Sequence, residues 1–375
     1  MNRFEQLHKV GQSIWLDYIR RDLLSSGELA GLIQGGEVRG VTSNPTIFES
    51  AIAGTELYTG TIEELVSKGL GAEEILDDLI LTDIRRACDQ FASLYEESKY
   101  LDGYVSVEVN PSLANDTTGT LAEAKRLWSE VNRNNVMIKI PATKAGIPAI
   151  RSAIAAGISV NVTLIFSLER YAEVMESYMR GLEDRVQQEK DINQAASVAS
   201  FFVSRVDSAV DRSLEILQSE NLLESNKASR LMGKAAIANG KLAYAAFISH
   251  FRTPRFEKLQ IEGAQLQRPL WASTSTKNPN YPDTYYVDNL IGPDTVNTLP
   301  PQTLEAFRDH GVVRNTIEEG LEEAEESLKN LEELGISMRE VTDQLEREGV
   351  EKFASSYMNL VDTVRAKVDS LQAIG

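Results

Sequence analysis

The chain has 375 residues, of which 42% are hydrophobic and 25% are charged, and this composition is typical of a globular protein with a large core. Its formal net charge of −18 argues against non-specific binding to nucleic acid or to an anionic membrane, so any phosphate site must be local. No run of about 18 apolar residues and no apolar leader occurs, so neither a membrane span nor a signal peptide is expected.

Cysteine and histidine are scarce. The single cysteine, Cys88, cannot form an internal disulfide, and the scarcity of cysteine indicates a cytoplasmic protein. Cys88 lies in a helical pattern, where it is usually a small buried residue. His8, His250 and His310 are isolated from one another, so we expect no histidine-based metal site. We also expect no cofactor, and a monomer or a homodimer.

Short runs rich in β-branched residues alternate with amphipathic helical patterns along most of the chain. The predicted strands cover residues 13–19, 38–45, 104–111, 135–142, 158–166, 197–205, 268–274 and 284–289. Helical patterns fill most of the intervals between them, for example at 120–133, 147–157 and 167–186. Strands that alternate with helices in this way predict parallel βα units.

Two segments exceed this repeating pattern. We interpret residues from about 221 to 256 as a helical insertion and residues from about 316 to 375 as additional C-terminal helices. No linker marks a second domain, so residues 1–375 are predicted to form one domain. The charge-dense stretch GLEEAEESLKNLEELG within the C-terminal segment is typical of a solvated helix face, and a partner-binding helix is the alternative.

Three predicted strands alternate apolar and polar residues, and alternate side chains of a strand face opposite sides. The apolar faces consist of Val105, Val107 and Val109, of Val136, Ile138 and Ile140, and of Val160, Val162 and Leu164. The opposite faces consist of Ser106, Glu108 and Asn110, of Met137 and Lys139, and of Ser159, Asn161 and Thr163. Because helices must cover the apolar faces, the polar faces are expected to line the inside of a (β/α)8 TIM barrel, near its C-terminal mouth.

Lys139 is the candidate nucleophile. Its neighbours Met137, Ile138, Ile140 and Pro141 would desolvate the amine, and desolvation favours the neutral form that attacks a carbonyl to give a Schiff base. The alternative is a structural lysine whose head reaches water or pairs with a carboxylate.

Glu108 and Asp17 are the candidate acid and base. Schiff-base formation needs a proton shuttle and aldol cleavage needs a base, so two carboxylates in different environments would serve. Each also has a structural interpretation: Glu108 as a salt-bridge partner of Lys139, and Asp17 as a buried carboxylate that accepts a structural hydrogen bond or caps a helix.

Polar residues elsewhere are candidate substrate ligands. Thr42 and Asn44 lie in the segment TSNPT, which is either a plain turn or, at the end of a strand, a pair of ligands for sugar hydroxyls. Ser200 and Arg205 lie near the start of a predicted helix, where free N–H groups and a guanidinium suit a phosphate. For Arg205, a surface ion pair with an aspartate is the alternative.

These segments together resemble the transaldolase family from about Val10 to Asn289, and the C-terminal helices fit its longer bacterial branch. Each motif alone is weak, whereas the ordered set is specific. The motifs that carry the resemblance are Thr42-Ser43-Asn44-Pro45, Ser106-Val107-Glu108, Ile138-Lys139-Ile140-Pro141, Asn161-Val162-Thr163-Leu164-Ile165-Phe166-Ser167 and Ser200-Phe201-Phe202-Val203-Ser204-Arg205.

The resemblance implies roles for these residues. Lys139 would form the Schiff base, Glu108 would act with Thr163 through a bound water as acid and base, and Asp17 would take the hydroxyl proton. The implied substrate-binding residues are Asn44 and Asn161 for a dihydroxyacetone unit, Ser200 and Arg205 for a phosphate, and Thr42 and Phe202 beside them. The expected reaction moves dihydroxyacetone from sedoheptulose 7-phosphate to glyceraldehyde 3-phosphate in the pentose phosphate pathway.

One motif departs from the family pattern. Many transaldolases place a second phosphate-binding arginine after strand seven, where this chain has Ser275. Lys277 is the candidate replacement, although a lysine cannot form the bidentate fork of an arginine and a surface lysine is the alternative. Two other functions stay open: a fructose 6-phosphate aldolase, whose known chains are much shorter, and a non-catalytic barrel that binds a sugar phosphate or a protein.

Overall fold

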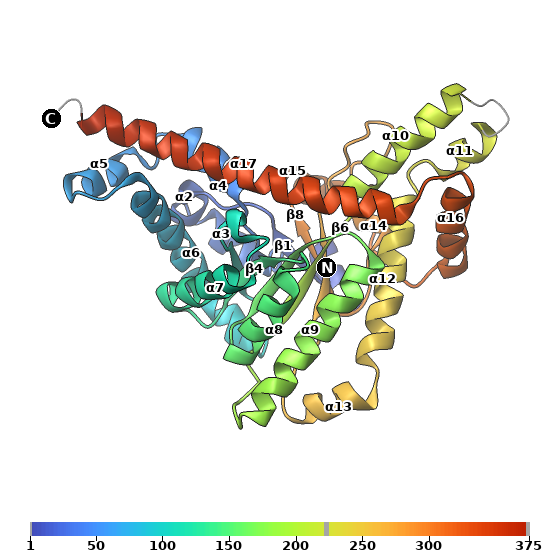
Figure 1. Cartoon of the computed structure of the whole chain (residues 1–375), viewed down its shortest axis with the longest axis horizontal. Helices are drawn as coiled ribbons and strands as arrows, with labels where there is room; N and C mark the ends of the chain where they lie inside the picture. The colour runs from blue at the N-terminus through green and yellow to red at the C-terminus, as the bar shows by residue number, and fades with distance from the viewer. Residues whose placement is uncertain (1, 221–224, 373–375) are drawn as a thin grey trace.

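The computed structural model describes residues 2–220 and 225–372. Within these residues, eight parallel strands form a closed barrel in the order β1 to β8, with helices around it (Figure 1). The strands are β1 Gln12–Leu16, β2 Gly40–Val41, β3 Tyr104–Glu108, β4 Val136–Pro141, β5 Val160–Ile165, β6 Ser197–Phe202, β7 Arg268–Ala272 and β8 Thr295–Leu299. Pairing of β8 with β1 closes the sheet and confirms the predicted (β/α)8 barrel.

Helices connect the strands and extend the chain beyond the barrel. In the described residues they are α1 Arg3–Val10, α2 Arg21–Ser25, α3 Glu28–Gln34, α4 Pro45–Ala53, α5 Thr59–Ser67, α6 Ala72–Glu97, η1 Pro111–Leu113, α7 Thr117–Val131, α8 Gly146–Ala156, α9 Leu168–Gln187, α10 Ser204–Glu220, α11 Ser225–Leu231, α12 Ala235–Phe251, α13 Pro254–Ile261, α14 Tyr285–Asn289, α15 Pro301–His310, α16 Leu321–Glu333 and α17 Met338–Gln372.

Several helices begin almost immediately after a strand, because a capping side chain is available there. Asn44 accepts a hydrogen bond from the Ile47 N–H at 3.0 Å and starts α4 with Pro45 in its first turn. Ser167 accepts from the Arg170 N–H at 3.1 Å and starts α9. Short strand-to-helix connections hold the ends of the strands, and hence their terminal side chains, in fixed positions.

The polar faces predicted for β3 and β5 turn into the barrel. Asn161 on β5 donates through Nδ2 to the Ser106 hydroxyl on β3 at 3.0 Å, and the Ser200 hydroxyl on β6 donates to Asn161 Oδ1 at 2.7 Å. All three side chains are buried. These three side chains therefore form a buried chain of hydrogen bonds inside the barrel.

Leu164 departs from the predicted alternation. The pairing of β5 with β6 shifts between Val162 and Ile165, and Leu164 there has a left-handed φ of 61°. Its side chain packs against Gly349 of α17, where an added Cβ would lie 2.9 Å from Leu164 Cδ2. Leu164 thus contacts the C-terminal helix over the mouth, whereas the sequence placed it on the apolar face with Val160 and Val162.

The eighth strand was predicted in the wrong place. Residues 285–289 of this segment form the short helix α14, and β8 is the later segment Thr295–Leu299. Aromatic and β-branched residues gave the first segment its high strand propensity, but tertiary contacts override it. Tyr286 donates to the Asp207 carboxylate at 3.0 Å and Tyr285 donates to the Gly233 carbonyl at 3.0 Å, and both bonds suit a helical turn packed beside the barrel.

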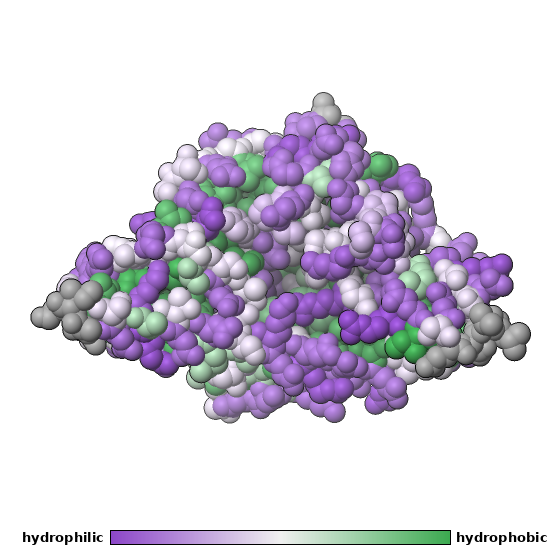
Figure 2. Space-filling model, turned by 90° about the horizontal axis from the view of Figure 1, so that it is seen from above, coloured by the Kyte–Doolittle hydropathy of each residue, from purple (hydrophilic) through white to green (hydrophobic). Residues whose placement is uncertain are grey.

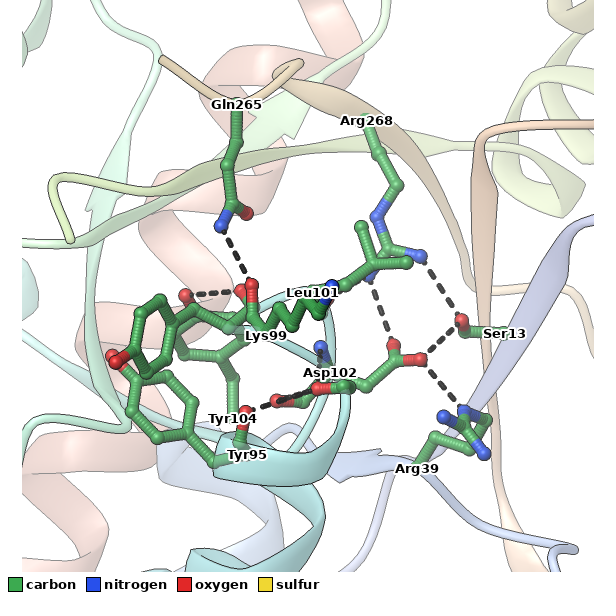
Figure 3. A network of polar contacts seen from close by, with 11 residues as sticks. Ser13, Arg39, Tyr95, Lys99, Leu101, Asp102, Tyr104, Gln265 and Arg268 are labelled. Carbon is green, nitrogen blue, oxygen red and sulfur yellow. Dashed lines mark hydrogen bonds and ion pairs between the residues drawn. The ribbon is translucent and has the colours of Figure 1, made fainter. Parts of the chain in front are cut away.

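A buried ionic network closes the N-terminal end of the barrel (Figure 3). The Asp102 carboxylate, directly before β3, accepts from Arg39 Nε at 2.6 Å, from Arg268 Nη2 at 3.0 Å and from the Ser13 hydroxyl at 3.0 Å. Burial by itself raises the pKa of Asp102, but the Arg268 and Arg39 guanidiniums outweigh it and hold the pKa below its ordinary value of 3.8. The charges are therefore paired at the opposite end from the mouth.

The two predicted additions to the barrel are helical where the structure describes them. The insertion contains α11, α12 and the start of α13, and residues 221–224 of it lie outside the described residues. The C-terminal segment contains α16 and the long helix α17, and its residues 373–375 also lie outside them. Most side chains of α16 are exposed, in agreement with a solvated face.

Helix α17 crosses over the barrel along the longest axis of the molecule (Figure 1). It packs against α4, α5 and α6 at one end and against α10 and α16 at the other. Seen from above, the surface is largely hydrophilic, with hydrophobic residues in small separate patches (Figure 2). Among the residues that the structure describes, no helix combines the length and the apolar character needed to cross a membrane.

Candidate active site

A cavity of about 520 Å³ opens at the C-terminal ends of the strands, where barrel enzymes carry their sites. Strand ends, the loop after β7 and helix α17 all contribute to its walls. It is lined by Asp17, Tyr18, Thr42, Asn44, Thr46, Ile47, Ser50, Lys139, Thr163, Ser200, Phe202, Arg205, Ala272, Ser273, Ser275, Lys277, Thr298, Pro300, Pro301, Gln302, Thr303, Lys352 and Phe353. Nine of the eleven predicted site residues therefore share one cavity.

Lys139 stands at the bottom of this cavity. Its side chain is only 5% exposed, and Nζ donates a hydrogen bond to the Ser43 carbonyl at 3.0 Å. Phe353 of α17 lies above it, with its ring centroid 5.8 Å from Nζ. An amine held by one carbonyl, with one face toward the cavity, is placed to meet a substrate carbonyl.

Glu108 is the acidic neighbour of Lys139. The two residues are paired across β3 and β4, and Glu108 Oε2 lies 3.6 Å from Lys139 Nζ. Burial raises the pKa of Glu108 to about 7, against the lowering effect of the Lys139 charge. A carboxyl group with this pKa exchanges a proton near neutral pH, which is what a proton shuttle requires.

Glu108 and Thr163 each have a buried oxygen that forms no hydrogen bond. Neither Glu108 Oε2 nor Thr163 Oγ1 has a hydrogen-bond partner among the described residues. Thr163 lines the cavity and pairs across the sheet with Pro141, two residues beyond Lys139, whereas Glu108 is not among the lining residues. Buried polar atoms without a partner are rare, so these two are candidates to bind a water or a substrate hydroxyl.

Asp17 also lines the cavity, directly after β1. Its Oδ1 accepts from the Thr42 hydroxyl at 2.7 Å, and the Thr42 and Thr298 hydroxyls lie 2.6 Å apart. Burial raises the pKa of Asp17, although the hydrogen bond from Thr42 and the Lys139 charge act in the other direction. The site therefore holds two carboxyl groups in different environments, one beside the amine and one bonded to the Thr42 hydroxyl.

Asn44 and Asn161 differ in how freely they can meet a substrate. Asn44 lines the cavity; its Oδ1 accepts from the Ile47 N–H, and its amide nitrogen forms no hydrogen bond with the described residues. Asn161 does not line the cavity, and its amide is held between Ser106 and Ser200. Ser200 lines the cavity, so it is the member of this chain of hydrogen bonds that a ligand can reach directly.

Arg205 forms the basic end of the cavity. Its guanidinium lies over the Phe202 ring, 5.1 Å from the centroid, and Phe202 packs on Phe166 with centroids 5.2 Å apart. Lys277 Nζ, in the loop after β7, donates to the Ser275 hydroxyl at 2.8 Å. Ser275, which occupies the position of the second arginine in the family pattern, therefore holds the amine of Lys277, the candidate replacement for that arginine. The structure thus brings Lys277 into the same cavity as Arg205.

Comparisons with known proteins agree with this arrangement. Residues 14–364 match the family described as Transaldolase/Fructose-6-phosphate aldolase. The chain belongs to this family. It is 50% identical to the transaldolase of Parafrankia sp. over 97% of both chains, and 47% identical to that of Mycolicibacterium smegmatis over 97% of both. It is also 45% identical to transaldolase 2 of Nostoc sp. over the full length of both.

Sequence reasoning missed several residues that line the cavity of this family member. Thr298 was missed because β8 was assigned to the wrong segment, although the run Thr295–Leu299 is rich in β-branched residues and bounded by prolines. Lys352 and Phe353 were missed because nothing in the helical pattern of the C-terminal segment indicates where it docks. In the described residues, no group of three or more His, Cys, Asp and Glu side chains is arranged to hold a metal ion.

Proposed function

We propose that this chain is a transaldolase that moves a dihydroxyacetone unit from sedoheptulose 7-phosphate to glyceraldehyde 3-phosphate, giving erythrose 4-phosphate and fructose 6-phosphate. The observation that carries the proposal is the buried Lys139 amine in the cavity, with Glu108 beside it and Asp17 in the same cavity wall. We place the reaction in the cytoplasm and in the non-oxidative pentose phosphate pathway, as composition and family resemblance predict.

In the first half of the reaction, the Lys139 amine adds to the ketose carbonyl carbon. The carbinolamine then loses its hydroxyl as water and becomes an iminium ion. Glu108, with Thr163 and a water between their unpartnered oxygens, supplies the proton for that hydroxyl. The new C=N bond then accepts the electron pair of the adjacent C–C bond when this bond breaks.

Cleavage needs a base on the other side of the substrate. Asp17 takes the proton of the hydroxyl on the carbon that becomes the aldehyde, the C–C bond breaks, and the aldose phosphate leaves. An enamine of dihydroxyacetone remains on Lys139. In the second half, the enamine carbon attacks the aldehyde of the acceptor, Asp17 returns the proton, and hydrolysis of the new iminium ion frees the amine.

Transfer, as opposed to simple cleavage, requires the enamine to outlast the departure of the first aldose. Protonation of the enamine carbon followed by hydrolysis would release free dihydroxyacetone. Phe353 packs over the mouth and is only 4% exposed, so its ring limits the access of water to the space above Lys139. This cover favours a transaldolase over a fructose 6-phosphate aldolase, the closest alternative.

Trapping the intermediate tests the proposal. The protein is incubated with fructose 6-phosphate, reduced with borohydride, digested, and analysed by mass spectrometry. A dihydroxyacetone-derived adduct on Lys139 is expected. Addition of erythrose 4-phosphate before reduction should discharge the adduct and yield sedoheptulose 7-phosphate. Free dihydroxyacetone as the main product would indicate an aldolase, and the absence of any adduct would indicate a non-catalytic sugar-phosphate or protein-binding barrel.

The pKa of Glu108 predicts a specific pH dependence. Because burial raises this pKa to about 7, the protonated carboxyl that donates to the carbinolamine hydroxyl is lost as the pH rises through 7. The rate of adduct formation should therefore fall above that pH. In Glu108→Gln the inflection near pH 7 should vanish and the rate should drop by about 10²-fold or more. An unchanged profile in the variant would remove Glu108 from this role.

A further inference from the structure

The cavity collects cations that have no carboxylate partner. Arg205 from the start of α10, Lys277 from the loop after β7 and Lys352 from α17 all line it. None of the three forms an ion pair with any residue that the structure describes. The chain has a net charge of −18, so these three unpaired cations make the cavity opening a positively charged region on an otherwise acidic protein.

The position of α17 directs Lys352 toward this group. Gly349 approaches Arg205 so closely that an added Cβ would lie 3.6 Å from Arg205 Nη1. Lys352 follows three residues later and so projects from the same face of the helix. Burial lowers the pKa of Lys277, and the charges of Lys352 and Arg205 lower it further, as expected for cations that face one another across a small space.

Nearby acids do not neutralise this group. Asp17 and Glu348 act on Arg205 electrostatically, but neither forms an ion pair with it in the described residues. Glu348 instead accepts from the Gln344 amide at 2.6 Å. The remaining groups on this wall, Ser273 and Ser275, are neutral hydroxyl donors. Three cations with neutral donors between them suit a dianion such as a phosphate monoester.

We infer that Lys352, on the C-terminal helix, binds the phosphate of the sugar substrate together with Arg205 and Lys277. The inference rests on the proposed function, and it names a ligand that lies outside the barrel strands and loops. In this arrangement the substrate's phosphate contacts both the barrel and α17. The neighbouring Phe353 covers the reacting end, so adjacent residues of one helix serve the two ends of the substrate.

The test compares variants that differ in one positive charge on α17. Lys352→Ala removes the proposed contact, and Lys367→Ala removes a lysine of the same helix that does not line the cavity. KM and kcat are measured with fructose 6-phosphate and erythrose 4-phosphate, and also with unphosphorylated fructose as donor. Inhibition by inorganic phosphate gives a direct measure of the subsite, and circular dichroism checks that each variant is folded.

Lys352→Ala should raise KM for fructose 6-phosphate and the inhibition constant of inorganic phosphate by about tenfold, with little change in kcat. With fructose as donor, and in Lys367→Ala, no change is expected. Lys352→Arg should restore most of the affinity for phosphate. Equal losses with fructose and fructose 6-phosphate, or equal behaviour of the two alanine variants, would overturn the inference.

The borohydride adduct separates this inference from the function on which it rests. If Lys139 is labelled in all variants but phosphate affinity is the same, Lys352 is not a phosphate ligand and the proposed function stands. If the unaltered protein gives no adduct on Lys139, the proposed function fails, and the inference fails with it.

Discussion

Lys139→Met should lower the rate of dihydroxyacetone transfer by about four orders of magnitude or more and abolish borohydride trapping. Methionine fills a similar volume in the buried site but has no amine, so neither carbinolamine nor iminium ion can form. The fold should persist, because removal of the Lys139 charge, which lowers the pKa of Glu108, lets the buried Glu108 carboxyl bind a proton and become neutral. Measurement requires single-turnover transfer with fructose 6-phosphate, with intact mass as the readout of the adduct.

The matched control for this variant is Lys144→Met. Lys144 comes five residues after Lys139, just beyond the end of β4, but it is exposed and does not line the cavity. Its replacement should leave transfer and trapping unchanged. If Lys139→Met kept a substantial transfer rate, or if an adduct appeared on another lysine, the assignment of the Schiff-base residue would be wrong.

Asp102→Ala should be the most destabilising single change at the other end of the barrel. Asp102 is fully buried, and its removal leaves the Arg268 and Arg39 guanidiniums without their counter-charge. Breaking a buried pair in this way costs about 3–5 kcal/mol in the free energy of unfolding. Denaturant unfolding monitored by circular dichroism measures the loss. KM for fructose 6-phosphate should not change in folded protein, because the network lies far from the mouth.

Asp89→Ala provides the comparison, because Asp89 pairs with Arg133 at 2.5 Å on the surface, with exposed fractions of 55% and 38%. The free energy of unfolding of Asp89→Ala should fall by less than about 1 kcal/mol. The pKa of Asp102 is held below 3.8 in the folded state, so its contribution is present above that value and is lost as the pH falls through the folded pKa. Unfolding stability should therefore depend less steeply on pH in this acid range in Asp102→Ala. Equal stability losses in the two variants would contradict a buried network.

Part of the fold and much of the candidate site followed from local rules. The alternation around Glu108, Lys139 and Thr163 indicated which side chains enter the barrel, because the strand period is two and helices cover the other face. The same rule failed at Leu164, where a left-handed residue breaks the period and turns the side chain toward α17. The alternation rule could not predict this break, because the position of a bulge depends on how the strand pairs with its neighbour.

The errors have one physical origin, which is contact between distant parts of the chain. Tyr285 and Tyr286 have strand propensity, yet their hydroxyls are held by Gly233 and Asp207 in a helical turn. Lys352 and Phe353 are ordinary helical residues in sequence, and their position in the cavity wall depends on how α17 packs on α4 and α10. Periodicity predicts that such a helix exists but does not predict its location.

The placement of α17 also has a consequence for how the protein is made. The strands that carry Lys139 and Glu108 are synthesised well before residues 338–372, so Phe353 and Lys352 join the cavity only after the rest of its wall has been made. Domains generally fold as units, so the barrel and the helix that covers it belong to one folding event. The last helix to be translated is therefore the one that finishes the cavity, and a chain that stops before residue 338 lacks two of the residues that line it.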